Sequence, residues 1–275
     1  MKRYMYITRL VMVLVVVLFF SSLAFSGEVQ KKLIDESAIE QAAKRGVIKV
    51  GMDIFVPWAM KDKKGELIGF EIDVAKKFAE DMGVKIEFIP TKWSGIIPAL
   101  ITGKFDVLIG GMTITTQRNL KINFSRPYYF VEQGLMANKN KTKGFKIEDF
   151  NSPDVIIAAR LGSTAAIAAK QNFPKAEIRL FDDEPSTVQE LLNGNVHATV
   201  SATILLYSTA LDHPDLIKVY DKSLMNEAIG IGVRKGDFDT INFINSWIEI
   251  NRNNGWIQEK YNYWFKTRDW KGMLE

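Results

Sequence analysis

The sequence predicts an α/β protein of two lobes, and three observations support that prediction. Strand-like and helix-like segments alternate along the chain, as in mostly parallel sheets covered by helices. The alternation runs from about residue 47, is interrupted near Pro127, and restarts near residue 155. The 275-residue chain is also long enough for two domains of ordinary size.

The first series begins with a buried strand, "VIKVGM". In "EIDVAKKFAEDMG" the apolar residues Val74, Ala75, Phe78 and Met82 recur at helical spacing, and Gly83 ends the helix. Glu71 and Asp73 fall in its first turn, where the helix dipole favours acids and a structural role is expected. The series predicts strands at 47–52, 84–90 and 106–111, helices at 71–83 and 95–105, and an extended segment at 130–140.

The second series repeats the pattern. We expect strands at 154–160, 177–181 and 197–201, and helices at 163–173, 186–194 and 202–211, with Ser186 or Thr187 capping the second helix. A last strand at 228–237 and helices at about 238–253 and 256–265 have no new series to join. We therefore expect them to return to the first lobe. The predicted first lobe is 27–135 with 228–275, and the second lobe is 136–227.

The N-terminus predicts export. Lys2, Arg3 and Arg9 precede an apolar run, and small residues follow with Ala24 and Ser26 at the −3 and −1 positions of a cleavage site. We predict a cleavable signal peptide at 1–26, with an uncleaved anchor as the alternative, and hence a periplasmic protein. Without the three basic residues of this segment, 33 basic and 32 acidic residues remain, so nothing indicates nucleic-acid binding.

Residue types exclude several kinds of chemistry. The chain has no cysteine, so disulfides, thiolate catalysis and cysteine metal sites are absent. Its two histidines, His197 and His213, lie in a strand-like run and before a proline. We expect neither to be catalytic, and we expect no metal site and no cofactor.

The stretch "GFEIDVAKKFA" (69–79) resembles the signature of the family 3 solute-binding proteins, the polar amino-acid receptors of bacterial ABC importers. Further matching stretches are "FVPW", "WSGIIPALITGKFDVLIGGMTITTQR", "FSRPYY", "GST", "ELLNG" and "IGVRKGD", and the resemblance covers roughly residues 38–270. It implies a two-lobed periplasmic binding protein fold of type II, with crossing hinge strands near 134–138 and 225–229. It also implies a monomer that delivers a small ligand to a membrane ABC permease.

The resemblance assigns the run "GGMTITTQR" (110–118) to the α-carboxylate of a ligand. Arg118 would form a bidentate pair with the carboxylate, because its planar guanidinium matches that geometry. Thr113 would add its hydroxyl and N–H, and Gly111 a backbone N–H. The alternative from the residues alone is a solvated arginine at the start of a surface helix.

Other matching positions complete the implied site. Phe55 and Trp93 correspond to rings that sandwich the ligand, while a similar role for Trp58 is open. Ser163 and Thr164 would offer hydroxyls and N–H groups at a helix N-terminus, or Ser163 would simply cap the helix.

The sequence departs from the family at Ala202, where amino-acid receptors carry an aspartate that pairs with the α-ammonium. No acid lies within four residues of Ala202. Arg160 is a second departure, able to hold another anionic group or to pair with an acid of its own lobe. We therefore expect a ligand without an α-amine: a keto acid, dicarboxylate or aromatic acid. The alternative is an ordinary amino acid whose ammonium meets a substitute acid, Asp182, Asp183 or Glu184.

An enzyme is the competing function, because cyclohexadienyl dehydratase shares the family. The resemblance places a catalytic glutamate of those enzymes early in the second-lobe helix. Here that stretch reads Ala165, Ala166, Ile167, Ala168 and Ala169, which cannot donate a proton. We therefore predict a receptor and not an enzyme.

Overall fold

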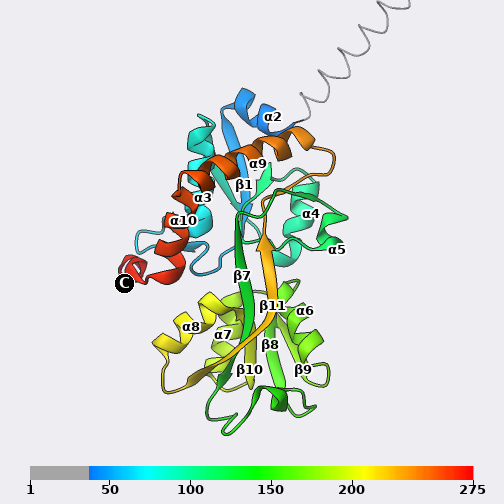
Figure 1. The fold of residues 1–275 in the computed structure, drawn as a ribbon, viewed down its shortest axis with the longest axis vertical. Helices are drawn as coiled ribbons and strands as arrows, with labels where there is room; N and C mark the ends of the chain where they lie inside the picture. Colours follow the sequence, from blue (N-terminus) through cyan, green and yellow to red (C-terminus); the bar gives the residue numbers. More distant parts are fainter. Residues whose placement is uncertain (1–36, 275) are drawn as a thin grey trace, which may run out of the picture.

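The protein has two lobes, each built on a five-stranded sheet with helices packed against it (Figure 1). The structure is a computed structural model and describes residues 37–274. The signal peptide predicted for 1–26 lies outside the described residues. Within the described part of the chain, no helix is both long and apolar enough to cross a membrane.

The first-lobe sheet has four strands that run in one direction and one that runs the other way. Its order is β4 (Lys85–Pro90), β1 (Val47–Met52), β5 (Val107–Leu108), β12 (Gly232–Val233) and β6 (Asn123–Phe124). A separate two-stranded hairpin, β2 (Met60–Lys61) and β3 (Leu67–Ile68), follows β1 in the sequence. β1 is parallel to β4 and β5, while β12 is antiparallel to β5 and β6. The predicted return of the C-terminal strand to the first sheet is therefore confirmed.

Helices from both ends of the chain belong to this lobe (Figure 1). They are α2 (Ala38–Arg45), α3 (Phe70–Asp81), α4 (Ile96–Ile101), α5 (Thr116–Asn119), α9 (Phe238–Asn253) and α10 (Trp256–Tyr261), with short turns at Trp93–Gly95, Asn262–Lys266 and Asp269–Met273. Apolar residues of α3 and α9, such as Phe78 and Trp247, meet edge to face at 5.2 Å. The lobe is thus closed by side chains more than 160 residues apart in sequence.

The second-lobe sheet has the order β11 (Ile217–Ile229), β7 (Tyr129–Asn138), β10 (Ala198–Ala202), β8 (Ile156–Arg160) and β9 (Glu177–Phe181). Its helices are α6 (Thr164–Asn172), α7 (Glu184–Leu192) and α8 (Thr203–Asp212), with a short turn at Ile147–Phe150. β8 is parallel to β9 and β10. All five residues of β10 are buried, as expected for a strand covered on both faces.

Two long strands connect the lobes. β7 and β11 pair antiparallel, and Figure 1 shows both running from one lobe into the other. Their register shifts between Tyr220 and Met225, and beyond this bulge the pairing continues to Tyr129 and Ile229. These strands include the predicted hinge segments near 134–138 and 225–229.

Most predicted elements are present, and two predictions were wrong. The predicted strand at 228–237 is two strands, β11 and β12, and β11 begins at Ile217. Its first residues alternate too little to be recognised from periodicity, because they are mostly polar or exposed. The cap of α7 is neither Ser186 nor Thr187: Asp183 accepts a hydrogen bond from the Ser186 N–H at 2.8 Å.

Candidate ligand-binding site

A cavity of about 30 Å³ lies between the lobes, at the ends of the parallel strands. In this conformation it has room for about two water molecules. Eight of the nine residues predicted to bind ligand line it: Phe55, Trp93, Gly111, Thr113, Arg160, Ser163, Thr164 and Ala202. Residues from both lobes thus converge on one small polar space.

The ninth predicted residue, Arg118, lies beside the cavity and bonds to both lobes. It sits on the short helix α5, whose cap Thr115 accepts a hydrogen bond from the Arg118 N–H. Its guanidinium donates to the Thr113 carbonyl at 3.0 Å and to the Gly162 carbonyl of the second lobe at 3.1 Å. Burial lowers the pKa of Arg118 to about 10, so the group remains charged at neutral pH.

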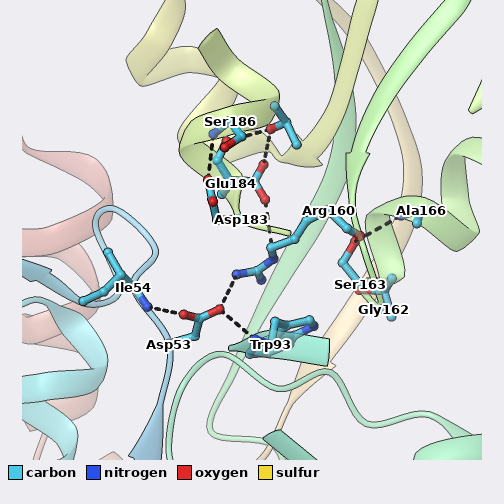
Figure 2. A network of polar contacts seen from close by, with 12 residues as sticks. Asp53, Ile54, Trp93, Arg160, Gly162, Ser163, Ala166, Asp183, Glu184 and Ser186 are labelled. Carbon is cyan, nitrogen blue, oxygen red and sulfur yellow. Dashed lines mark hydrogen bonds and ion pairs between the residues drawn. The ribbon is translucent and has the colours of Figure 1, made fainter. Parts of the chain in front are cut away.

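Arg160 fills the space between the two predicted aromatic rings. Its guanidinium carbon lies 4.9 Å from the centre of the Phe55 ring and 4.4 Å from that of Trp93. Nη1 is 3.5 Å from Asp53 of the first lobe, and Nε is 3.7 Å from Glu184 of its own lobe (Figure 2). The structure thus contains the pairing of Arg160 with an acid of its own lobe, which was the alternative to holding a ligand anion.

Burial disfavours the charged forms of the two acids beside Arg160. Burial raises the pKa of Asp53, and the nearby Arg160 counteracts this most strongly. The pKa of Glu184 is raised for the same reason and is likewise lowered in part by Arg160. Arg160 therefore favours the charged form of both carboxylates, and Asp53 also accepts a hydrogen bond from the Trp93 N–H at 3.1 Å.

The hydroxyls at the start of α6 are partly occupied by the protein itself. Ser163 caps this helix by accepting from the Ala166 N–H at 3.2 Å, and it donates to the Arg160 carbonyl at 2.6 Å. The capping role is thus present, while the Thr164 hydroxyl lies 3.3 Å from that of Thr113 and faces the cavity.

Gly111 contributes differently from the role that the resemblance implied. Its φ of +73° favours glycine, and its backbone N–H bonds to the carboxylate of Glu71. Glu71 is fully buried and also accepts from the Tyr128 and Tyr129 hydroxyls, each at 2.6 Å. Burial raises its pKa to about 7. The N–H of Gly111 is therefore engaged with the core, and a structural role for Glu71 agrees with its position.

The three acids considered as substitutes near Ala202 lie in different places. Asp182 is exposed and pairs with Lys92 across the lobes at 2.9 Å. Asp183 caps α7 and is directed to the Ser186 N–H. Only Glu184 lines the cavity, and there it faces Arg160.

Glu227 is a cavity residue that the sequence reasoning missed. It lies on β11, is 4% exposed, and accepts from Thr113 Oγ1 and Gln133 Nε2, both at 2.9 Å. The available signal was its position in a predicted hinge strand, where an acid directly precedes an apolar run. Glu227 follows Ala202 by 25 residues in the sequence, so no pattern close to Ala202 points to it.

The carboxylates of the cavity also bear on the question of catalysis. The first turns of α6 hold no acid, as the sequence indicated. Glu184 and Glu227 nevertheless reach the cavity from α7 and β11. The absence of an acid from α6 therefore does not by itself leave the site without a proton donor.

Comparisons with known proteins place the chain among binding proteins. The L-cystine-binding protein TcyJ of Escherichia coli K12 is 27% identical over 242 residues, which cover 87% of this chain and 90% of that protein. The ancestral amino-acid-binding protein AncCDT-1, a precursor of cyclohexadienyl dehydratase, is 39% identical with a TM-score of 0.78, covering 83% of this chain and all of that one. An ABC transporter binding component from Wolinella succinogenes, solved with lysine, is 37% identical with a TM-score of 0.78 and covers 83% and 99%.

These likenesses confirm the two-lobed periplasmic binding protein fold. The relatives include amino-acid-binding proteins, and one solved structure is described as a precursor of an enzyme. A family model for bacterial extracellular solute-binding proteins, family 3, matches residues 48–267, four fifths of the sequence. The chain belongs to the family 3 bacterial extracellular solute-binding proteins.

Proposed function

We propose that the protein is the periplasmic solute-binding receptor of an ABC importer, exported by a signal peptide at 1–26, and that it closes as a monomer around a small carboxylate held by Arg118. One observation carries the proposal. Arg118 lies at the junction of the lobes and is half-buried, and although Glu227 raises its pKa from a distance, no carboxylate among residues 37–274 lies within ion-pair distance of it. A ligand anion would supply the missing partner.

A carboxylate suits Arg118 better than other anions of the same size. Its guanidinium already donates to one carbonyl from each lobe, and the remaining N–H groups present a planar fork to a carboxylate. A ligand that contacts both lobes stabilises the closed state, because only that state offers all the contacts. Rotation about β7 and β11 would open the cavity for entry.

The cavity narrows the range of ligands. Arg160 is paired with Asp53 and Glu184, so a second ligand carboxylate finds no free cation there. The same guanidinium occupies the space between Phe55 and Trp93, where an aromatic ligand ring would have to stack. A small monocarboxylate therefore fits this conformation better than a dicarboxylate or an aromatic acid.

A dehydratase-like enzyme is the second candidate, and one observation favours it. Glu184 lines the cavity beside Arg160, and burial raises its pKa above the ordinary value, which favours its protonated form. The position would suit a general acid acting on a ring-bearing acid. Incubation of the purified protein with prephenate or arogenate, followed by absorbance and mass spectrometry, tests this activity. Turnover abolished in the Glu184→Gln variant would replace the receptor proposal.

A thermal-shift screen of the purified protein tests the receptor. The panel contains amino acids, keto acids, dicarboxylates and aromatic acids, and hits are measured by calorimetry. Arg118→Ala should weaken binding of a hit by on the order of several-hundred-fold, because it leaves the ligand carboxylate buried and unpaired. Arg179→Ala, which removes an exposed arginine of β9, is the matched control. Normal binding by Arg118→Ala would show that the ligand is held elsewhere.

A further inference from the structure

Glu71 is a fully buried acid that lies directly behind the wall of the cavity between the lobes. It belongs to the first turn of α3 and is 0% exposed. Its carboxylate accepts hydrogen bonds from the Tyr128 and Tyr129 hydroxyls, each at 2.6 Å, and from the Gly111 N–H. Tyr129 and Gly111 also line the cavity, so Glu71 is bonded to two residues of its wall.

Tyr129 extends this network from Glu71 to the aromatic part of the cavity wall. Its hydroxyl accepts from the Trp58 Nε1–H at 2.8 Å while it donates to Glu71. The Trp58 ring stacks on Phe55 at 4.3 Å, and both rings line the cavity. The Tyr129 hydroxyl also lies beside Gly111, because a Cβ added to Gly111 would be 3.5 Å from the hydroxyl oxygen. Glu71 therefore holds Gly111, Tyr129 and, through Tyr129, Trp58 in place.

The charged form of Glu71 fixes the direction of both tyrosine hydroxyls. An ionised carboxylate only accepts hydrogen bonds, so Tyr128 and Tyr129 must each donate their single proton to it. The Tyr129 hydroxyl then has no donor left for the cavity. A protonated Glu71 carries one O–H, which can donate to the Tyr129 oxygen across the same 2.6 Å. That oxygen has two acceptor sites, one for Glu71 and one for Trp58, so its own proton is then free to donate into the cavity.

The titratable groups on the elements packed around Glu71 do not pair with its charge. They are Tyr128 and Tyr129 of β7, Asp73 of α3, Lys49 of β1, Lys85 and Glu87 of β4, and Lys260 and Tyr261 of α10. Burial raises the pKa of both β7 tyrosines well above the ordinary value, so they stay neutral. Lys260 pairs with Asp73 at 3.6 Å, and Lys49 with Glu87 at 3.8 Å. Among residues 37–274, no lysine or arginine lies within ion-pair distance of Glu71, so its charged form depends on hydrogen bonds.

Burial brings the two forms of Glu71 into balance near neutral pH. It raises the pKa of Glu71 to about 7, while the three hydrogen bonds act in the opposite direction. The charged groups of the cavity itself, Arg118, Arg160, Glu184 and Glu227, are not among the groups that shift this pKa. An anionic ligand in the cavity would favour protonated Glu71, because a like charge behind the wall is removed and a donor is gained. Ligand affinity should therefore be highest below pH 7 and fall as the pH rises through 7.

We propose that Glu71 is a positioning residue that couples ligand binding to proton uptake: when Glu71 is protonated, the Tyr129 hydroxyl turns into the cavity and donates to the anionic group of the ligand. The proton comes from solution and stays on Glu71, and no bond within the ligand changes. The inference rests on the proposed receptor function, because it describes how the same cavity responds to acidity. It adds a role in binding to the structural role that the sequence indicated for Glu71.

Calorimetry at several pH values measures the coupling on the unaltered protein. The probes are pyruvate and L-alanine, together with the ligand that binds most tightly in the thermal-shift panel. Titrations in phosphate and in Tris, which differ in heat of protonation, give the number of protons taken up for each ligand bound. We expect roughly a few tenths of a proton near pH 7, since Glu71 is then about half protonated in the free protein. Absence of proton uptake at this pH would overturn the inference.

The affinity itself should follow the same titration. Binding should be on the order of tenfold tighter at about pH 5.5 than at about pH 8.5, because the protonated state supplies one more hydrogen bond to a charged group. An affinity that is constant over this range, or that rises with pH, would contradict the sign of the coupling.

Variants assign the proton to Glu71. Glu71→Gln keeps the shape of the side chain and stays neutral, so it should abolish the proton uptake and bind with the low-pH affinity throughout. Glu80→Gln, which removes an exposed acid of the same helix, is the matched control and should retain the uptake. Proton uptake that persists unchanged in Glu71→Gln would show that another group titrates.

Two tyrosine variants keep the test decisive if Glu71→Gln does not fold. Tyr128→Phe removes one donor from the charged carboxylate, at a position outside the cavity lining, and should move the midpoint of the pH dependence to higher pH. Tyr129→Phe removes the hydroxyl that turns, so the affinity should lose its pH dependence while infrared difference spectra still show a buried carboxyl group that titrates. An unshifted midpoint in Tyr128→Phe, or full pH dependence in Tyr129→Phe, would count against the coupling.

The two proposals fail in different ways. If a panel member binds and Arg118→Ala weakens it, but binding takes up no proton through Glu71, the receptor stands and the coupling is wrong. If no panel member binds, or if Arg118→Ala leaves the affinity unchanged, the receptor proposal is wrong and the coupling falls with it.

Discussion

Replacement of Arg160 by alanine is expected to weaken the contact between the lobes and to leave a space that a small cation can occupy. Arg160 lies between Asp53 and Glu184, within ion-pair distance of both, and its side chain is 5% exposed. It also stacks between Phe55 and Trp93, which belong to the opposite lobe. Arg160→Ala thus removes charge compensation and aromatic contact together, within the buried contact between the lobes.

The loss in free energy of unfolding can be estimated from these contacts. Removing one partner of a buried ion pair costs about 3–5 kcal/mol, because the remaining charges stay buried. The pKa values of Asp53 and Glu184, already raised by burial, should rise further without Arg160, so part of the loss would be relieved by protonation at low pH. For a chain of this length, about 3–5 kcal/mol corresponds to a fall in unfolding temperature of roughly 6–20 °C.

Differential scanning calorimetry and small-angle scattering measure the two consequences. We expect a lower unfolding temperature and a larger radius of gyration for Arg160→Ala than for the unaltered protein. Millimolar guanidinium, at matched ionic strength, should stabilise the variant alone by occupying the vacated space. The control variant Arg179→Ala should change neither the unfolding temperature nor the radius of gyration. An unaltered unfolding temperature in Arg160→Ala, or equal stabilisation of both proteins by guanidinium, would refute the reasoning.

Two further predictions concern stability. The pKa of Glu71 is about 7 in the folded protein against 4.5 as its ordinary value, so the folded state binds the extra proton between these pH values. The free energy of unfolding should therefore fall by up to about 3 kcal/mol as the pH rises from 4.5 to 7. Glu71→Gln should remove this slope from urea-unfolding data, and parallel pH profiles would contradict the assignment. Gly69→Ala should destabilise by about 2 kcal/mol or more, because φ is +134° and the added Cβ would lie 2.3 Å from the Trp58 carbonyl oxygen. Gly272→Ala, whose added carbon meets open space, is the control, and equal melting temperatures for the two variants would rule out that clash.

The fold was largely predictable because its signals are local. Apolar periodicity located α3 and β1, and the order of strands and helices indicated two lobes. The C-terminal strand and helices were expected to return to the first lobe because no further strand–helix series follows that they could join. By contrast, the length of β11 was not predictable, since its polar first half carries no alternation and is placed by pairing with β7.

The site was predictable where one residue or one short run defines it. Arg118, Thr113 and Trp93 come from contiguous stretches, and the lobes bring them together. Glu227 was not found, because its place beside Gln133 depends on a bulge between Tyr220 and Met225. A shift of one residue would direct the side chain to the other face of the strand. The pairing of Arg160 with Asp53 similarly depends on lobe closure, which no local pattern encodes.

A crystal structure of the protein with the ligand that binds most tightly in the screen tests the account most directly. The account predicts a ligand carboxylate within hydrogen-bond distance of Arg118 and ligand contacts with residues of both lobes. Arg160 should remain between Phe55 and Trp93. A ligand whose carboxylate lies away from Arg118 would contradict it.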